Sequence, residues 1–378
     1  MNDEFEIQEA LPEPHEFHEL ELSMGPQHPS THGVLRLLLT LDSEVILNAT
    51  AHVGYLHRGF EKLAEGMTYI QFVPYTDRLD YVSAITNELG YCLAAEKLIG
   101  VEAPRRAQYL RVIASELQRL ASHLLFVATM GTDLAAVTVF LYGFRDRERV
   151  IDLLDSLSGQ RLTYHYLRLG GVAADVPPGF DRNVSDLIQY LTPRLDEMDD
   201  LFTNNVIFRR RTEGVGILPP GRALDLGVSG PNLRASGVPY DTRKADPYSS
   251  YQEFDFRIPT GKNGDCFDRF AVRMEEMRQS LRILGQAVKG LPEGEFRAKV
   301  ARNVKPPMGE AYAHVEGSRG DVGFYIISDG STNPYRLKIR GPSFVHVMAL
   351  ERILKGWKIA DVVATLGSVD IVLGEVDR

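Results

Sequence analysis

The polar and apolar positions near the start of the chain predict strands, and those that follow predict helices. The stretches "VLRLLLTL" (34–41) and "EVILNATAHV" (44–53) are separated by Asp42 and Ser43, a pair typical of turns. We therefore expect these two stretches to form paired strands. Further along, the pattern becomes helical, with apolar residues recurring at intervals of three and four.

The clearest helical pattern begins at Pro104, a residue type favoured in the first turn of a helix, and ends at Gly131. Its apolar positions form one continuous stripe, which predicts a helix face packed against a core. These positions are Leu110, Ile113, Leu117, Leu120, Leu124 and Val127. Another pattern opens on Asp77 and closes on Gly100, as capped helices do. Further helices are predicted at about residues 133–157, 184–205 and 267–288.

The rest of the chain carries weaker patterns. Residues 212–264 are rich in Gly, Pro, Asn and Tyr, which predicts a long irregular segment with a functional or interfacial role. Residues 311–344 are typical of strands joined by turns, with "SDGSTNP" as one turn. We expect an α+β protein, mainly α, in one domain (26–378) that follows an acidic extension (1–25). Its predicted parts are N-terminal β elements (about 33–53), a helical core (about 55–290), and C-terminal β elements with a tail (about 311–378).

Composition and charge exclude several classes of protein. The net charge is −9, and residues 1–35 contain eight acidic residues without any Lys or Arg, so the remainder carries only about −1. No basic stripe with interleaved aromatic residues is present, so we expect no nucleic-acid partner. No apolar run approaches the roughly 18 residues that a membrane span requires, and the acidic start does not resemble a secretory signal. The sequence thus predicts a cytoplasmic protein whose two cysteines, Cys92 and Cys266, are buried and unpaired.

Motifs of common catalytic sites are missing. The chain has no GxGxxG after a strand, and no GxxxxGK[ST], GxSxG, HExxH or CxxC. The stretch "GPQHPSTHG" places His28 and His32 four residues apart, a spacing that binds a metal only on a shared helix face. Pro29 disfavours helical geometry at His28, so we expect no metal at this pair. Composition alone favours a binding or scaffolding subunit.

Four stretches nevertheless resemble one family closely. From about Met24 to its last residue, the chain is similar to the D-subunit family of NADH-quinone oxidoreductase, the counterpart of the mitochondrial 49-kDa subunit of respiratory complex I. The stretches that carry the resemblance are "YLHRGFEKLAE", "PYTDRLDYVSAITNE", "GDCFDRFAVRMEEMRQS" and "DIVLGEVDR". This family in turn resembles the large subunit of [NiFe]-hydrogenases, which implies a helix-bundle core with small peripheral β-sheet elements.

The hydrogenase motifs are present here without their cysteines. Residues 58–61 match RGxE, residues 78–83 match RxCGxC, and residues 370–378 match DPCxxCxxH, with Arg378 at the final histidine. The four cysteine positions hold Asp80, Ser83, Val372 and Glu375. Nickel in that site needs four thiolates, which are soft ligands. These replacements therefore exclude a nickel site and hydrogenase activity, and we expect this chain to bind no metal.

The resemblance implies that the former metal cavity is the end of a quinone tunnel. His32 and Tyr81 match the family's ligands of the quinone head group, and Asp133 matches the carboxylate that pairs with the histidine. The chemistry is suitable, because donors on the quinone oxygens stabilise charge that develops during reduction. A carboxylate beside His32 would also raise its pKa and make it a better proton donor.

Three further residues take roles from the same resemblance. Arg58 and Arg78 match arginines close to an iron–sulfur cluster, where permanent positive charge favours the reduced cluster. Val372 is a candidate for the tunnel wall. Each candidate also has a structural interpretation. These are a loop hydrogen bond for the histidine, an ordinary helix position for the tyrosine, a helix cap for the aspartate, surface or ion-pair roles for the arginines, and core packing for the valine.

Cofactors and partners are implied in the same way. This chain would bind no cofactor of its own: the B subunit of the complex holds the terminal [4Fe-4S] cluster, and NADH and FMN bind elsewhere in the complex. The C and I subunits and the membrane-embedded H subunit are the other expected partners, with the chain peripheral, on the cytoplasmic side of the cell membrane, in the hydrophilic arm of a proton-translocating complex. Two alternatives stay open, namely a complex driven by ferredoxin or another reduced carrier, and a structural subunit with a dead site.

One position departs from the family. A histidine that many members carry near the cluster is Thr163 here, and His165 follows two residues later. We expect the His165 side chain to point elsewhere, which weakens pH-dependent tuning of the cluster. The resulting hypothesis is that the quinone is one of low potential, such as menaquinone.

Overall fold

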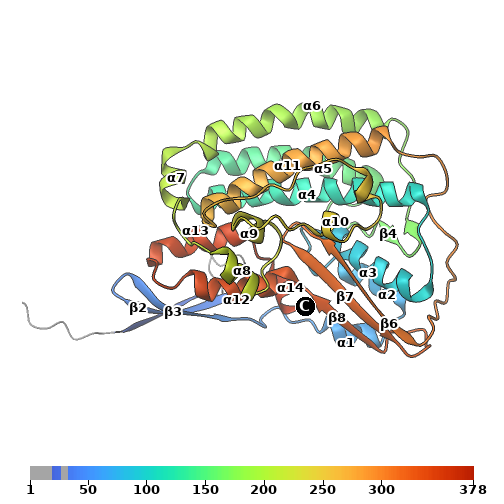
Figure 1. The fold of residues 1–378 in the computed structure, drawn as a ribbon, viewed down its shortest axis with the longest axis horizontal. Coiled ribbons are helices and arrows are strands. Elements are labelled where there is room, and N and C mark those ends of the chain that lie inside the picture. Colours follow the sequence, from blue (N-terminus) through green and yellow to red (C-terminus); the bar gives the residue numbers. More distant parts are fainter. Residues whose placement is uncertain (1–18, 27–32) are drawn as a thin grey trace, which may run out of the picture.

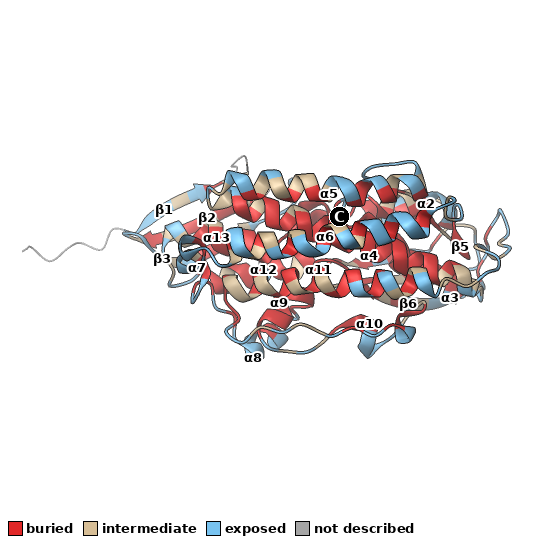
Figure 2. Ribbon diagram, turned by 90° about the horizontal axis from the view of Figure 1, so that it is seen from above, coloured by how far each residue is buried: buried red, intermediate tan, exposed pale blue. Residues whose placement is uncertain are grey.

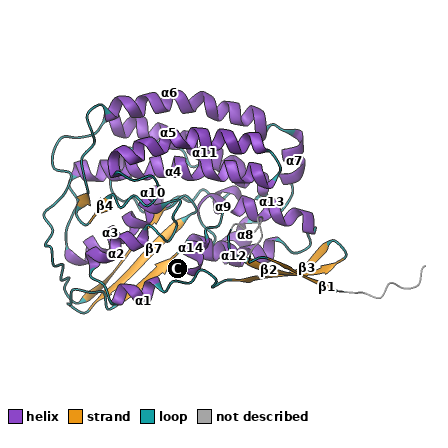
Figure 3. Ribbon diagram, turned by 180° about the vertical axis from the view of Figure 1, so that it is seen from behind, coloured by secondary structure: helices purple, strands orange, loops and turns teal. Residues whose placement is uncertain are grey.

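The computed structural model describes residues 19–26 and 33–378. A layer of long helices lies on one side of the molecule, and two three-stranded antiparallel sheets lie on the other (Figures 1 and 3). This arrangement confirms the predicted α+β class, mainly α. Residues 19–25 of the acidic extension are described and include a strand at Leu20–Met24, whereas residues 1–18 lie outside the described residues; the division into an extension and one domain stays a prediction.

Four long helices form the bundle that the apolar stripes predict. They are α4 (Arg105–Asp133), α5 (Val137–Ser158), α6 (Phe180–Met198) and α11 (Cys266–Lys289). Helix α4 lies at the centre and packs against α5 and α11, and α6 covers α5 and α11 from outside. Figure 2 shows the result, with α4 buried along most of its length and α5 and α6 each exposing one face.

Glycine permits the close contact between α4 and α5. A Cβ atom at Gly143 would lie 2.8 Å from Cβ of Ala128, and one at Gly131 would lie 2.8 Å from Cβ of Val139. Such distances are too short for a side chain, so both positions need glycine.

Both cysteines are buried free thiols, as predicted.

The N-terminal sheet belongs to a second, smaller core. Its antiparallel strands are β1 (Leu20–Met24), β2 (Arg36–Asp42) and β3 (Val45–His52), and β2 and β3 confirm the predicted pair. Leucines at alternate positions of β2 point inward and pack with α12 (Pro342–Ile353), α13 (Ile359–Val369) and α14 (Leu373–Asp377). The C-terminal tail is therefore part of a core and not a loose end.

The C-terminal sheet packs against the first helices. Its antiparallel strands are β6 (Gly309–Glu316), β7 (Asp321–Ser328) and β8 (Arg336–Arg340). Strands β6 and β7 cover α3 (Ala84–Ile99), while α1 (Phe60–Glu65) lies on β8. The predicted turn "SDGSTNP" connects β7 to β8, as expected.

Short elements make up the connections. Helix α2 (Tyr69–Thr76) precedes α3, and β4 (Leu167–Arg168) pairs with β5 (Gly171–Val172) after α5. A π-helical turn (Asp199–Thr203) continues α6 toward α7 (Val206–Thr212). The predicted irregular segment contains only short helices, which are α8 (Pro220–Asp225), α9 (Gly230–Ala235), α10 (Thr242–Ala245) and a 3₁₀ turn (Tyr251–Glu253).

Two predicted helix starts are wrong. Asp77 does not open a helix, since it follows the last residue of α2 and α3 begins only at Ala84. Its carboxylate accepts a hydrogen bond from the distant backbone N–H of His165, so a tertiary contact replaces the expected local cap. Asp133 does not begin a helix either, because α4 continues past Gly131 and ends at Asp133, and α5 starts at Val137.

Candidate functional site

The turn between α2 and α3 carries Tyr81 and Arg78. Almost every residue from Thr76 to Ala95 is buried, but these two side chains point outward. Tyr81 is 38% exposed, while its neighbours Asp80 and Val82 are buried. The buried residues of the turn thus pack into the interior, while the phenol of Tyr81 and the guanidinium of Arg78 lie at the surface.

Arg58 ties this turn to the C-terminal tail. Its Nη2 donates to the carbonyl oxygen of Arg78 at 2.6 Å and to that of Gly374 at 3.1 Å. Gly374 is itself pressed against the turn, because a Cβ atom there would lie 2.3 Å from the carbonyl oxygen of Leu79. Three segments that are far apart in the sequence therefore meet at one guanidinium.

The phenol of Tyr81 stays protonated in this setting. Burial, with the nearby Asp80 carboxylate, raises the pKa of Tyr81, although Arg319 and Arg58 act in the opposite direction. A phenol with a raised pKa keeps its proton at neutral pH and can donate it in a hydrogen bond.

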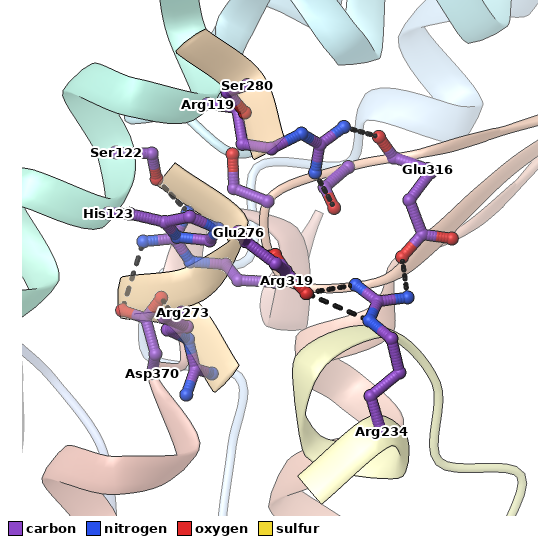
Figure 4. A network of polar contacts seen from close by, with 12 residues as sticks. Arg119, Ser122, His123, Arg234, Arg273, Glu276, Ser280, Glu316, Arg319 and Asp370 are labelled. Carbon is purple, nitrogen blue, oxygen red and sulfur yellow. Dashed lines mark hydrogen bonds and ion pairs between the residues drawn. The ribbon is translucent and has the colours of Figure 1, made fainter. Parts of the chain in front are cut away.

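Beneath the turn, Arg319 gathers buried carboxylates around its guanidinium (Figure 4). Its Nη1 donates to Asp80 Oδ2 at 3.0 Å and to Ser122 Oγ at 2.9 Å, and its Nη2 donates to Asp370 Oδ1 at 3.1 Å. Ion pairs of this kind offset much of the desolvation cost that buried charges carry. Arg319 lies in the turn between β6 and β7, and the Gly-rich stretch around it gave no sequence signal of a buried role.

Three of the four hydrogenase cysteine positions lie near Arg319: Asp80 pairs with it, Glu375 interacts with its charge, and Ser83 contacts the residue before it. Ser83 Oγ lies 3.0 Å from Oγ of Ser318, the residue before Arg319. Glu375 accepts a hydrogen bond from the backbone N–H of Ser343, and burial together with the nearby Asp80 raises its pKa to about 8. Val372 is buried two residues after Asp370. A cationic side chain of this protein, Arg319, therefore lies close to Asp80, Ser83 and Glu375, three of the positions that the hydrogenase motifs fill with cysteine.

The network extends further into the bundle. Arg234 pairs with Glu276 at 2.6 Å and with Glu316 at 2.8 Å, and His123 Nε2 lies 2.8 Å from the same Glu276 (Figure 4). Arg119 donates to the carbonyl oxygens of Glu316 and Gly317, just before Arg319. These side chains are all buried, so the interior beneath the turn is charged, with ion pairs between arginines and carboxylates.

Comparison with known proteins gives one consistent result. A sequence model for the family described as "Respiratory-chain NADH dehydrogenase, 49 Kd subunit" matches residues 133–304 and 297–378. A relative from Solibacter usitatus, named as the "D 2" subunit of NADH-quinone oxidoreductase, is 54% identical over 360 residues, which cover 95% of this chain and 97% of the relative. The chain belongs to the 49-kDa subunit family. Relatives from Desulforamulus reducens and Carboxydothermus hydrogenoformans, each named as the D subunit of NADH-quinone oxidoreductase, are 53% and 50% identical over 359 residues, 95% of this chain and 98% of each relative.

The predicted site residues of this 49-kDa family member divide into two groups. Arg58, Arg78 and Tyr81 meet at the turn, and Val372 lies in the tail that packs on it. His32, like His28, lies outside the described residues. Asp133 lies at the end of α4, with its Oδ2 close to Gly367. It is 11 residues, or about 16 Å along the helix, from Ser122, the α4 residue that contacts Arg319 beneath the turn. Its predicted pairing with His32 stays a prediction.

Among the residues that the structure describes, no helix combines the length and apolar character needed to cross a membrane.

Proposed function

We propose that this chain is the component of a proton-translocating NADH-quinone oxidoreductase that forms most of the quinone head-group site. The site would lie beside a terminal [4Fe-4S] cluster held by the B subunit, with the C, I and H subunits as further partners on the cytoplasmic side of the cell membrane. The names of the relatives specify NADH and quinone, which favours this function over a carrier-driven complex. Two cysteines are too few to hold such a cluster in this chain.

One observation carries the proposal: Tyr81 is exposed on a turn whose other residues, apart from Arg78, are buried. A tyrosine used only for packing would not need this position. A protonated phenol at a rigid surface is well suited to donate a hydrogen bond to a quinone oxygen. Preorganised donors of this kind stabilise negative charge as it develops, without reorganising at the moment of reaction.

The other candidates have roles that follow from charge and position. Reduction of the quinone consumes two electrons and two protons, and His32 would donate to the second oxygen with Asp133 as its partner. Arg58 and Arg78 would place permanent positive charge near the partner's cluster, and Val372 would line the tunnel. Arg58 also fixes the position of Tyr81 indirectly, since it holds the carbonyl of Arg78 against the tail.

The test uses the assembled complex with Tyr81→Phe and His32→Ala. We expect each variant to lower quinone reduction on the order of a hundredfold, the usual cost of losing one preorganised donor. Oxidation of NADH with ferricyanide as acceptor should persist, because electrons enter through other subunits.

Tyr335→Phe is a matched control, since Tyr335 is 66% exposed in the connection between β7 and β8, away from the turn. It should reduce quinone as the unmodified complex does. If Tyr81→Phe and His32→Ala also reduce quinone normally, the proposed site is wrong and the alternative of a purely structural role gains support.

A further inference from the structure

A second group of buried polar side chains lies on the other side of the same turn. Asp77 stands at the end of α2, Glu88 lies in α3, and His165 precedes β4. One carboxylate oxygen of each acid and one imidazole nitrogen all lie within 4.8 Å of one another. Within the described ranges, 19–26 and 33–378, this is the single group of three or more His, Cys, Asp or Glu with such spacing.

Hydrogen bonds from backbone N–H groups fix the orientation of the two carboxylates. Asp77 Oδ2 accepts from the N–H of His165 at 3.0 Å. Glu88 Oε2 accepts from the N–H groups of Tyr166 and Leu167 at 3.1 and 2.9 Å. With one oxygen of each carboxylate engaged in this way, the other oxygen is turned toward the common space.

Three atoms that face this space receive no hydrogen bond from any other described group, although Asp77 and Glu88 can share a proton between them. These atoms are Asp77 Oδ1, Glu88 Oε1 and His165 Nδ1. Both acids are completely buried, and leaving such groups unpaired is costly. His165 Nδ1 lies 3.5 Å from Glu88 Oε1, which is a typical separation for two ligands of one tetrahedral metal but long for a hydrogen bond.

Nearby arginines do not neutralise the pair. Arg78 Nη1 comes no closer than 3.9 Å to Asp77 Oδ2 and donates instead to the carbonyl oxygen of Pro74. Arg168 uses its Nη1 on the carbonyl oxygens of His165 and Leu167. The two carboxylates therefore face each other with no cation in hydrogen-bond contact.

We propose that Asp77, Glu88 and His165 bind one divalent transition-metal ion such as Zn²⁺. Such an ion would neutralise both carboxylates and be coordinated by the imidazole nitrogen, so that Asp77 Oδ1, Glu88 Oε1 and His165 Nδ1 all become ligands. The ion would also fasten the segment before β4 to α2 and α3. This site departs from the expectation, drawn from the missing thiolates, that the chain binds no metal. It is separate from the proposed quinone site and does not depend on it.

In this chain by itself, an ion can reach this position from solvent. The His165 side chain is 32% exposed and lines a surface pocket of about 310 Å³. Arg168 and Arg297 line the same pocket, and their charge disfavours weakly held hard cations. Imidazole suits zinc and similar metals better than calcium or magnesium, so we expect selection for a transition metal.

The test measures zinc in the purified complex. Complexes carrying Glu88→Gln or His165→Asn are dialysed against Zn²⁺ beside the unmodified complex, and bound zinc is measured by mass spectrometry of the elements. Gln keeps a carbonyl oxygen for the backbone N–H groups. Asn suits the left-handed backbone at His165, whose φ is 43°. We expect the unmodified complex to bind one more zinc ion than either variant, with affinity at this site at least tenfold weaker in each.

His314→Gln provides a matched control. His314 also lies between two carboxylates, but its Nδ1 contacts Asp321 and its Nε2 contacts Asp246, so its partners are on opposite sides and cannot share an ion. This variant should bind as much zinc as the unmodified complex. If the Glu88 and His165 variants also retain the full amount, no metal binds here, and infrared detection of a protonated carboxyl lost in Glu88→Gln would identify a shared proton instead.

Discussion

Asp77 and Asp80 lie three residues apart in one turn, and both are buried, yet their surroundings are opposite. Asp80 faces the guanidinium of Arg319, with Ser122 and Asp370 on the same group. Asp77 faces a second acid, Glu88, and its pKa rises to about 9 through burial and this neighbour. Arg78 separates the two environments and points outward between them.

The difference shows two ways in which a protein accommodates a buried carboxylate. Burial raises the pKa of Asp80, and Arg319 opposes that rise and fixes the position of the carboxylate through a hydrogen-bonded ion pair. Without a cation in contact, a buried acid such as Asp77 must hold a proton or bind a metal ion, and either can exchange with solvent. Asp80 and Arg319 support the turn of the proposed quinone site, whereas Asp77 and Glu88 belong to the proposed metal site.

Removal of the fixed cation should have the largest effect. In Arg319→Gln, Asp80 loses the guanidinium that it pairs with, and Asp370 loses one of its cations while Arg273 remains 3.7 Å away. We expect a loss of about 3 to 5 kcal/mol in the free energy of unfolding, as measured by urea unfolding of the purified full-length chain. Arg336→Gln is the control, because its pairs with Glu61 and Glu65 are partly exposed and should contribute less than about 1 kcal/mol. Equal losses in the two variants would contradict the role assigned to Arg319.

The two aspartates should respond differently to the same substitution. Asp80→Asn removes one charged partner of Arg319 and should cost about 2 to 3 kcal/mol. Asp77→Asn replaces a carboxyl that is already protonated at neutral pH, and the amide oxygen can still accept from His165. In zinc-free buffer we therefore expect a loss below about 1 kcal/mol, again by urea unfolding. A larger loss for Asp77→Asn than for Asp80→Asn would reverse the comparison.

A further expected effect is a dependence of stability on pH near Arg319. Glu375 has a folded pKa of about 8 against an ordinary value of 4.5, because of burial and Asp80. Between these values the folded chain holds a proton that the unfolded chain releases, so this group makes stability fall as pH rises from about 4.5 to 8.

Glu375→Gln should remove that contribution, which is at most about 1.4 kcal/mol per pH unit. Unfolding in urea at pH 5, 6, 7 and 8 would show a shallower decline in the variant. Gln at this position can still accept from the backbone N–H of Ser343, which separates the charge effect from the hydrogen bond. Parallel declines in both chains would show that Glu375 does not hold the proton.

The elements that were predicted well are those with long, local patterns. The apolar stripe from Leu110 to Val127 became the buried face of α4, and the strands on either side of Asp42 paired as expected. The left-handed C-cap at Gly100 ends α3 where the glycine indicated. Such patterns repeat over many residues, so a single tertiary contact cannot override them.

Single polar residues were predicted less well. Asp77 has the form of a helix cap, but its carboxylate bonds to a backbone group 88 residues away. Arg319 stands in a Gly-rich turn that suggests exposure, yet it is buried at the centre of an ion network. Tyr81, Arg58 and Arg78 were selected through the family resemblance, since nothing in their local sequence distinguishes them from ordinary surface residues.

The sequence by itself determined the helical and strand periods, the family, and the loss of the four thiolates that nickel would need. Only the tertiary structure decided which buried acid meets a cation and which meets another acid. The physical reason is that apolar patterning acts over neighbouring residues, whereas the state of a buried charge depends on groups brought within a few ångströms from distant segments. Asp77 and Asp80 share one turn, but Arg319 reaches one and Glu88 the other.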